Sequence, residues 1–500
     1  MPDETQDSRH DKTASNVELS AGPAIGQDEW VARQAERRSG RAGRLGNAEQ
    51  RLRAAPWWVW LALFTGLVAL LPVAVASGYW RRVAFDTALI VLLALGLNVV
   101  VGWAGLLDLG FVAFFGVGAY TYAYLSSEKY DIHFPTVATV PIVVAIGAVV
   151  GFLLGLPSRR LVGDYLAIVT LFFLQIFLTV TTQGDDVFGH NVTNGPNGIL
   201  NVDPFSFFGH DLAVSSSNGV FNVAYLYVAL GVFVVVYVAL RFVNLSRTGR
   251  AWRSLREDPL AAEVMGMPVN WLKLMSFSFG AAVAALTGSL FAAVNADVFN
   301  LSFNFPLLIT VYTAVILGGS GSQPGVVLGA IIIWPLQERL REPGDSRVLF
   351  YSLILVGLVV AFRRSIRLGL VLGGTLALGF AVHAVAGTID STWVNGASSG
   401  PGQVADWASH WVVVPSHLAS WVAPVSYISL IAAALTLTLL RGWARLVLLV
   451  PVLYLAAFVW ENVMLAQPEP TRFIVVGGLL VALMVVRPNG LLGEKRVEVV

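Results

Sequence analysis

The sequence predicts an all-α integral membrane protein, a polytopic bundle of about fourteen transmembrane helices. Hydrophobic residues make up 56% of the 500 residues, charged residues make up 13%, and the mean hydropathy is +0.70. A soluble domain of ordinary composition is less apolar and carries about twice that share of charged residues. Strands of a membrane barrel would alternate apolar and polar residues over shorter segments, so a helical bundle is expected.

The apolar runs give the expected helices in order. They begin near Trp57, Asp86, Asp108, Phe134, Asp164, Phe221, Trp271, Phe305, Gln323, Arg347, Leu368, Pro424, Gly442 and Thr471. Small residues at helical spacing, such as Gly147, Gly151 and Gly155, predict close contacts between these helices. Residues 1–56 lack apolar periodicity, and we expect a disordered tail there. Arginines at the end of this tail favour its retention in the cytoplasm, and binding of anionic lipid is the alternative reading.

The distribution of charge predicts the topology. Most of the 32 Lys and Arg residues lie on one side if the amino terminus is cytoplasmic. The loops 183–220 and 387–423 contain neither residue type, and we expect both outside the membrane. An even number of helices then returns the carboxyl terminus to the cytoplasm.

A polar loop at 244–271 separates two long apolar runs on the expected cytoplasmic side. Within it, Asp258 can cap a short helix, Pro259 suits the first helical position, and Gly266 can end the helix. Such a helix either presents itself to a partner or is a solvated surface element. The helix pattern alone does not decide between these readings.

The sequence lacks the residues of a catalytic centre. There is no cysteine, the seven His are scattered, and none of the four Lys follows a glycine as a nucleotide-binding loop would require. We expect no buried Asp, Glu, Lys or Arg in the interior of a span, which argues against proton coupling. The glycine-rich segment 318–325 is expected to line a translocation path where spans are broken.

Several motifs resemble one family of transporters. They are residues 96–120, 163–170, 194–199 and 248–266 together with 317–322, and residues 487–493 also fit. In these motifs the chain resembles the permease subunit of bacterial branched-chain amino acid ABC importers, of the LivM type. The resemblance covers residues 57–341, which would form the core permease helices. It implies an ABC importer permease fold in the bacterial inner membrane.

The resemblance also implies functional residues. Those that would couple to a cytoplasmic ATPase are Arg256, Glu257, Asp258, Pro259, Ala261, Ala262, Glu263 and Gly266. Those along or beside the translocation pathway would be Asn98, Gly102, Gly105, Asp108, Gly110, Asp164, Gln175, Gly318, Gly319 and Gly321. Helix capping is an equal alternative for Asp108, and Gln175 stands where many family members carry Glu.

The implied partners complete an ATP-driven importer. They are ABC ATPase subunits that hold ATP and Mg²⁺, a second related permease or a second copy, and an extracytoplasmic binding protein. The chain itself is expected to bind no cofactor, metal or nucleic acid and to be a transport subunit rather than an enzyme. Leu, Ile or Val is the expected solute, while urea, amides and other amino acids stay open. An ion-coupled secondary transporter of small amphipathic solutes is the main rival interpretation.

The chain departs from the family pattern at residues 342–470. This inserted membrane segment contains about four extra spans and an external loop with several Trp residues. Those Trp residues suit the membrane interface or contact with the binding protein. Residues 471–500 are expected to form the last helix and a cytoplasmic end.

Overall fold

A computed structural model describes residues 56–74, 77–159, 161, 163–185, 191–207, 210–214, 221–362, 366–396 and 403–493. The chain divides into two units, residues 1–68 and 69–500. In the first unit the described part is the start of helix α3 (Trp57–Ala74). The predicted disordered, arginine-bearing tail lies outside the described residues. The second unit holds the elements that follow.

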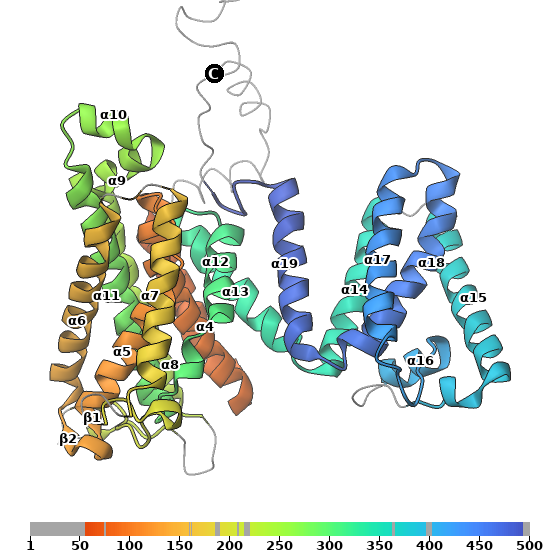
Figure 1. Cartoon of the computed structure of the whole chain (residues 1–500), viewed down its shortest axis with the longest axis horizontal. Coiled ribbons are helices and arrows are strands. Elements are labelled where there is room, and N and C mark those ends of the chain that lie inside the picture. The colour runs from red at the N-terminus through yellow and green to blue at the C-terminus, as the bar shows by residue number, and fades with distance from the viewer. Residues whose placement is uncertain are drawn as a thin grey trace, which may run out of the picture. The chain divides into compact units, whose positions relative to one another are not determined.

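Each of the fourteen predicted apolar runs is a helix (Figure 1). After α3 they are α4 (Gly78–Leu97), α5 (Phe111–Leu125), α6 (Thr136–Ser158), α7 (Asp164–Thr182), α8 (Val223–Leu245), α11 (Val269–Asn295), α12 (Phe305–Gly318), α13 (Gln323–Arg339), α14 (Pro343–Phe362), α15 (Ile366–Ile389), α17 (Val422–Leu439), α18 (Trp443–Val459) and α19 (Pro468–Val486). Among the described residues, 10 helices are long and apolar enough to cross a membrane. A multi-pass membrane protein is thus confirmed, whereas the count of fourteen spans is not.

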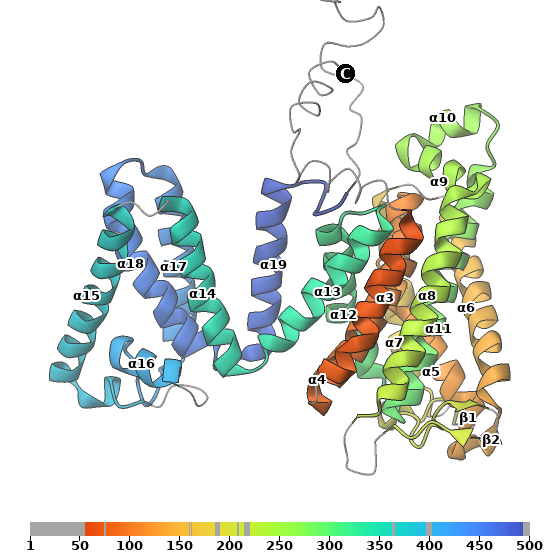
Figure 2. The ribbon, with the colours of Figure 1, turned by 180° about the vertical axis from the view of Figure 1, so that it is seen from behind.

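Helix α11 packs against α4, α5 and α6, and Figure 2 shows this group from behind. Small residues allow the close approach that the sequence predicts. A Cβ at Gly151 would overlap Ala281, and a Cβ at Gly118 would overlap the backbone of Ala285. Without a strong hydrophobic force between helices in lipid, such close packing supplies much of their attraction.

Helix α4 does not end at Leu97 but continues as a π-helix, Asn98–Trp103. The chain then runs as a loop through residues 104–110 before α5 begins. The short helices α12 and α13 pack against each other and against α4. The turn between α12 and α13 contains Gly319 and Gly321, both with positive φ. π-Helices are frequent at functional sites, and glycine-interrupted helices are frequent at the binding sites of transporters.

The expected external end carries two small hairpins. Strands β1 (Ser126–Ser127) and β2 (Ile132–His133) form one, and β3 (Ser206–Phe207) and β4 (His210–Asp211) form the other. Single bridges, Ser127 to Val202 and Ile199 to Val298, tie the described part of the 183–220 loop to its neighbours. This loop is therefore a folded cap in its described part.

The inserted segment forms its own helical group. Helices α15, α17 and α18 pack together, α14 contacts α15, and the short helix α16 (Gln403–Trp411) lies against α14 and α15. Helix α18 ends in a second π-helix, Trp460–Met464. The chain then returns to α12 and α13 through α19, where Leu317, Ile333 and Val476 form a buried cluster.

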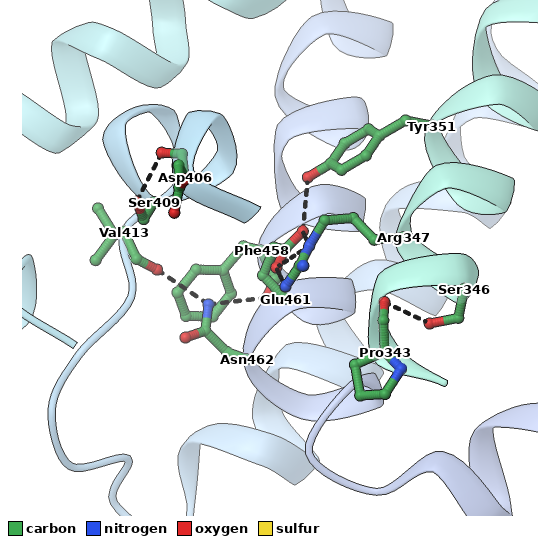
Figure 3. A network of polar contacts seen from close by, with 10 residues as sticks. All are labelled: Pro343, Ser346, Arg347, Tyr351, Asp406, Ser409, Val413, Phe458, Glu461 and Asn462. Atoms are coloured by element: carbon green, nitrogen blue, oxygen red, sulfur yellow. Dashed lines mark hydrogen bonds and ion pairs between the residues drawn. The ribbon is translucent and has the colours of Figure 1, made fainter. Parts of the chain in front are cut away.

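One expectation about the spans is wrong. Arg347 of α14 and Glu461 of the second π-helix are buried ionisable groups within candidate spans (Figure 3). Each compensates the charge of the other, which makes their burial tolerable. Both belong to the inserted segment, so the pair does not lie among the predicted pathway residues.

Candidate functional site

The polar loop at 244–271, which the sequence predicts to be cytoplasmic, folds into two short helices, α9 (Arg247–Glu257) and α10 (Pro259–Val264). Asp258 lies between them, and its Oδ1 accepts hydrogen bonds from the backbone N–H groups of Leu260 and Ala261 at 2.9 and 3.0 Å. Gly266 follows with a φ of +79°, a left-handed conformation that costs glycine little. The predicted cap and stop are confirmed, and they make α10 a defined element rather than a loose turn.

Helix α10 presents an uncovered apolar surface. Leu260, Val264 and Met265 are 71%, 81% and 79% exposed, and α10 lies beyond the end of α11 in Figure 1. Of the predicted coupling residues, Glu257, Asp258, Pro259, Ala261, Glu263 and Gly266 are also exposed, whereas Ala262 is buried. We refer to Leu260, Val264 and Met265 as the α10 apolar surface. A capped helix that exposes such a surface to water is typical of a protein–protein contact.

Arg256 differs from the other predicted coupling residues because it points into the protein. Its guanidinium donates to the carbonyl of Gly102 in the first π-helix and, at 3.4 Å, to Ser320 Oγ in the glycine-rich turn. Gly105 lies so close that a Cβ there would contact Arg256 at 2.8 Å. A single side chain next to α10 thus binds both irregular segments of the core.

Two tryptophans make a parallel connection. Trp252 of α9 and Trp103 of the π-helix stack, with ring centroids 6.2 Å apart and an interplanar angle of 22°. Trp103 Nε1 donates to the carbonyl of Gly321 at 3.0 Å, and Trp252 Nε1 donates to that of Leu272 at 2.9 Å. Both rings are buried. The stack therefore couples α9, the π-helix and the glycine-rich turn through packing as well as hydrogen bonds.

The π-helix and the glycine-rich turn also bind each other directly. Asn98 Oδ1 accepts from the backbone N–H of Gly321 at 2.8 Å. A Cβ at Gly102 would overlap both of these residues, so only glycine fits there. The structure therefore brings together the predicted pathway residues Asn98, Gly102, Gly319 and Gly321. Gly318 precedes Gly319 at the end of α12, where it packs against α13.

Asp108 is fully buried in the loop before α5. Its Oδ1 accepts from the N–H of Gly110 at 2.9 Å, and Gly110 occupies the N-cap position of α5. The backbone of Asp108 is held by Tyr312, whose hydroxyl donates to the Asp108 carbonyl at 2.6 Å. Asp108 thus organises the turn before the helix.

A few buried polar atoms near these segments have no hydrogen-bond partner in the described protein. They are Asp108 Oδ2, Asn98 Nδ2 and both amide atoms of Gln323. Gln323 begins α13, directly after the glycine-rich turn. Unpaired polar atoms in a protein interior are costly unless water or a ligand binds them. These groups mark polar positions beside the π-helix that a polar solute or water can use.

Two predicted pathway residues lie elsewhere. Asp164 begins α7 and is exposed, and Gln175 is exposed on the face of α7 that carries Phe172 and Ile176. The structure does not bring either residue to the Asn98 group. Sequence reasoning missed Tyr312, and it missed Thr170, whose Oγ1 accepts a hydrogen bond from the backbone N–H of Leu109 at 2.9 Å. Ser320 and Gln323 lie in the glycine-rich segment 318–325, which the sequence singled out only as a whole. Thr170 and Ser320 fall within quoted motifs, whereas Tyr312 stands in an apolar run with no local signal of its role.

Within the described ranges, no three His, Cys, Asp or Glu side chains are grouped so that they could hold a metal ion. The arrangement consists of a capped helix with an exposed apolar surface, two connections from it into the core and a set of irregular segments with unpaired polar atoms. Through these connections, a movement of α9 and α10 can be transmitted to the π-helix and the glycine-rich turn.

Comparison with known proteins agrees with this arrangement. Residues 80–363 match the family model described as branched-chain amino acid transport system / permease component. The LivM high-affinity branched-chain amino acid permease proteins of Salmonella typhimurium and Escherichia coli are each 36% identical to the chain, and each alignment covers 58% of the chain and 70% of the relative. LivH of Salmonella typhimurium is 29% identical over 41% of the chain and 63% of the relative. No solved structure matches. The chain therefore belongs to the permease component family of branched-chain amino acid transport systems.

Proposed function

We propose that this chain is the membrane permease subunit of an ATP-driven importer that moves branched-chain amino acids into the cytoplasm. The observation that carries the proposal is the α10 apolar surface, held on a capped helix and connected to the core by Arg256. The printed names of the LivM and LivH relatives support the solute class. The chain is a transport subunit, and hydrolysis of ATP with Mg²⁺ takes place on a separate cytoplasmic subunit.

Alternating access is the mechanism we propose. Helix α10 sits in a groove of the ATPase, and closure of the ATPase pair on ATP moves α9 and α10 together. Arg256 then displaces Gly102 and Ser320, while Trp252 displaces Trp103. Because the π-helix and the glycine-rich turn are bonded to each other, they move as one unit and change access to the polar groups beside them.

The pathway suits a zwitterion with an apolar side chain. Asp108 and the amides of Asn98 and Gln323 provide polar groups, while the surroundings of the π-helix are largely apolar. A second permease subunit, related to LivH, pairs with this chain in the proposed complex. A binding protein delivers the solute to the external loops, and both termini lie in the cytoplasm. Most of the selectivity then resides in the binding protein.

The test is to alter the α10 apolar surface without altering the fold. Leu260→Asp with Val264→Asp places two charges on exposed positions, so neither residue loses buried contacts. Leu301→Asp, at a residue that is 78% exposed outside α10, is the matched control. We expect the double variant to enter the membrane normally but to lose its co-purifying Walker-motif ATPase and its uptake of labelled leucine.

Each alternative gives a different result. If the double variant keeps its ATPase and takes up leucine as the control does, the docking assignment is wrong. If neither variant binds an ATPase and uptake follows a sodium or proton gradient, the chain is an ion-coupled transporter. Competition of labelled leucine by isoleucine, valine, urea and simple amides then decides the solute class.

A further inference from the structure

A cavity in the inserted segment lies away from the candidate functional site. It is formed by α14, α15, α17 and α18 of the inserted segment and has a volume of about 440 Å³. Its polar lining includes the side chains of Arg367 and Arg445, with Trp443 beside them. Its apolar lining includes Leu358, Leu437 and Leu449. The guanidinium groups of Arg367 and Arg445 and the apolar leucine side chains thus line the same cavity.

The charge around this cavity is all of one sign. The turn between α14 and α15, the turn between α17 and α18 and the first residues of α15 and α18 together contain five arginines in the sequence: Arg363, Arg364, Arg367, Arg441 and Arg445. No Asp or Glu occurs in residues 346–389 or 407–460. Among the described residues, neither Arg367 nor Arg445 forms a salt bridge. The described residues offer these two exposed arginines no carboxylate partner, so an anion from outside the chain can bind them.

The position of the cavity relative to the membrane indicates which class of anion can reach it. Arg367 stands one residue after the start of α15, and Arg445 stands two residues after the start of α18, so both lie at the ends of candidate spans. Trp443 is 68% exposed, as expected of an aromatic anchor at the membrane interface. The positive-inside rule places these two turns at the cytoplasmic leaflet, which is rich in anionic lipid. A ligand there must satisfy both the arginines and the leucines.

We propose that this cavity binds one anionic phospholipid of the cytoplasmic leaflet. The phosphate binds between Arg367 and Arg445, and an acyl chain lies along Leu358, Leu437 and Leu449. Arginine suits phosphate because its planar guanidinium offers paired N–H donors. Basic cavities between transmembrane helices on the cytoplasmic side are known to hold lipid headgroups. The proposal does not depend on the transport function of the chain.

The experiment measures lipid retained by the purified full-length chain in an uncharged detergent. Phosphatidylglycerol is titrated and bound lipid is counted by native mass spectrometry, with phosphatidylcholine as the uncharged comparison. Arg367→Gln and Arg445→Gln each remove one cavity charge. Arg441→Gln removes the same charge from an exposed residue of the same turn that does not line the cavity. We expect about fivefold weaker binding for each cavity variant and unchanged binding for the control.

A second variant tests the apolar half of the site. Leu449→Trp fills the channel while leaving every charge in place, and we expect it to weaken phosphatidylglycerol binding as well. Equal binding by wild type, cavity variants and control would overturn the proposal. If inorganic phosphate displaces the lipid and Leu449→Trp binds as tightly as the wild type, the site is a simple phosphate site. That result would overturn the assignment to a lipid. Binding of phosphatidylcholine with equal affinity would also overturn it.

Discussion

Arg347 and Glu461 form a bidentate ion pair in which the side chains are 1% and 0% exposed. Nε of the arginine lies 2.9 Å from Oε1 of the glutamate, and Nη2 lies 2.9 Å from Oε2 (Figure 3). Tyr351 Oη donates to the same carboxylate at 3.1 Å. Phe350, next to Tyr351, stacks on Trp460, with centroids 4.2 Å apart. The pair therefore fixes α14 against the π-helix that ends α18.

Removing one member of this pair leaves an uncompensated charge in the interior. We expect Glu461→Gln or Arg347→Met to lower the free energy of unfolding by about 3–5 kcal/mol. Replacing both together with apolar residues should cost much less, because no buried charge then remains. Asp345→Asn, which breaks an exposed pair with Arg339, is the control and should cost at most about 1 kcal/mol. Equilibrium unfolding in detergent by denaturant measures all four, and equal losses for buried and exposed pairs would contradict this account.

Replacing Arg256 should weaken the coupling of ATP hydrolysis to uptake without weakening binding of the ATPase to α10. Arg256→Gln removes charged hydrogen bonds to Gly102 and Ser320 but leaves the α10 apolar surface intact. We expect the variant to retain its ATPase partner while solute uptake per ATP falls at least about tenfold, the effect of losing about 1.5–3 kcal/mol of charged hydrogen bonding. Arg253→Gln on the exposed side of α9 is the matched control. Loss of ATPase binding in Arg256→Gln, or normal coupling, would refute the role of this arginine as a connection.

Close helix packing gives a prediction on stability. Gly118→Ala places a methyl group against the backbone of Ala285 on α11, and we expect a loss of about 1–3 kcal/mol from overpacking. Gly231→Ala in α8 meets nothing within 4 Å and should be neutral or slightly stabilising, since alanine favours helix. Thermal unfolding of the two variants side by side checks the difference. A neutral Gly118→Ala would mean that α5 and α11 can separate without cost.

The hairpin of β1 and β2 gives a dependence on pH. His133 Nδ1 lies 2.6 Å from a carboxylate oxygen of Asp203, and this hydrogen bond raises the pKa of His133. A group with a raised pKa stabilises the folded state below its unfolded pKa of about 6.5, and the stabilisation is lost as pH rises through the folded value. We expect the unfolding temperature of wild type relative to His133→Gln to fall as pH increases from 6 to 8. Asp203→Asn should remove the same dependence, and a difference that does not change with pH would contradict the pairing.

Local signals were sufficient for some features and not for others. Each apolar run became a helix, and Asp258, Pro259 and Gly266 set the ends of α10, because these preferences act over a few residues. The ion pair joins residues 114 positions apart, and Tyr312 binds Asp108 across 204 positions. No periodicity reports such contacts, which depend on how helices pack. For the same reason hydropathy alone could not say which short helices cross the membrane.

The return of α19 has a consequence for biosynthesis. Leu491 donates its backbone N–H to Leu317 at 2.9 Å, and Leu492 donates to Gly318 at 3.0 Å, so the final motif seals the glycine-rich turn. These contacts form only after the ribosome has translated the whole inserted segment. During translation the end of α12 therefore lies in the bilayer without its contacts to Leu491 and Leu492 while α14 to α18 insert and assemble. The ion pair in the inserted segment can close before that point, so the late-made part of the chain can be ordered before the early-made part is complete.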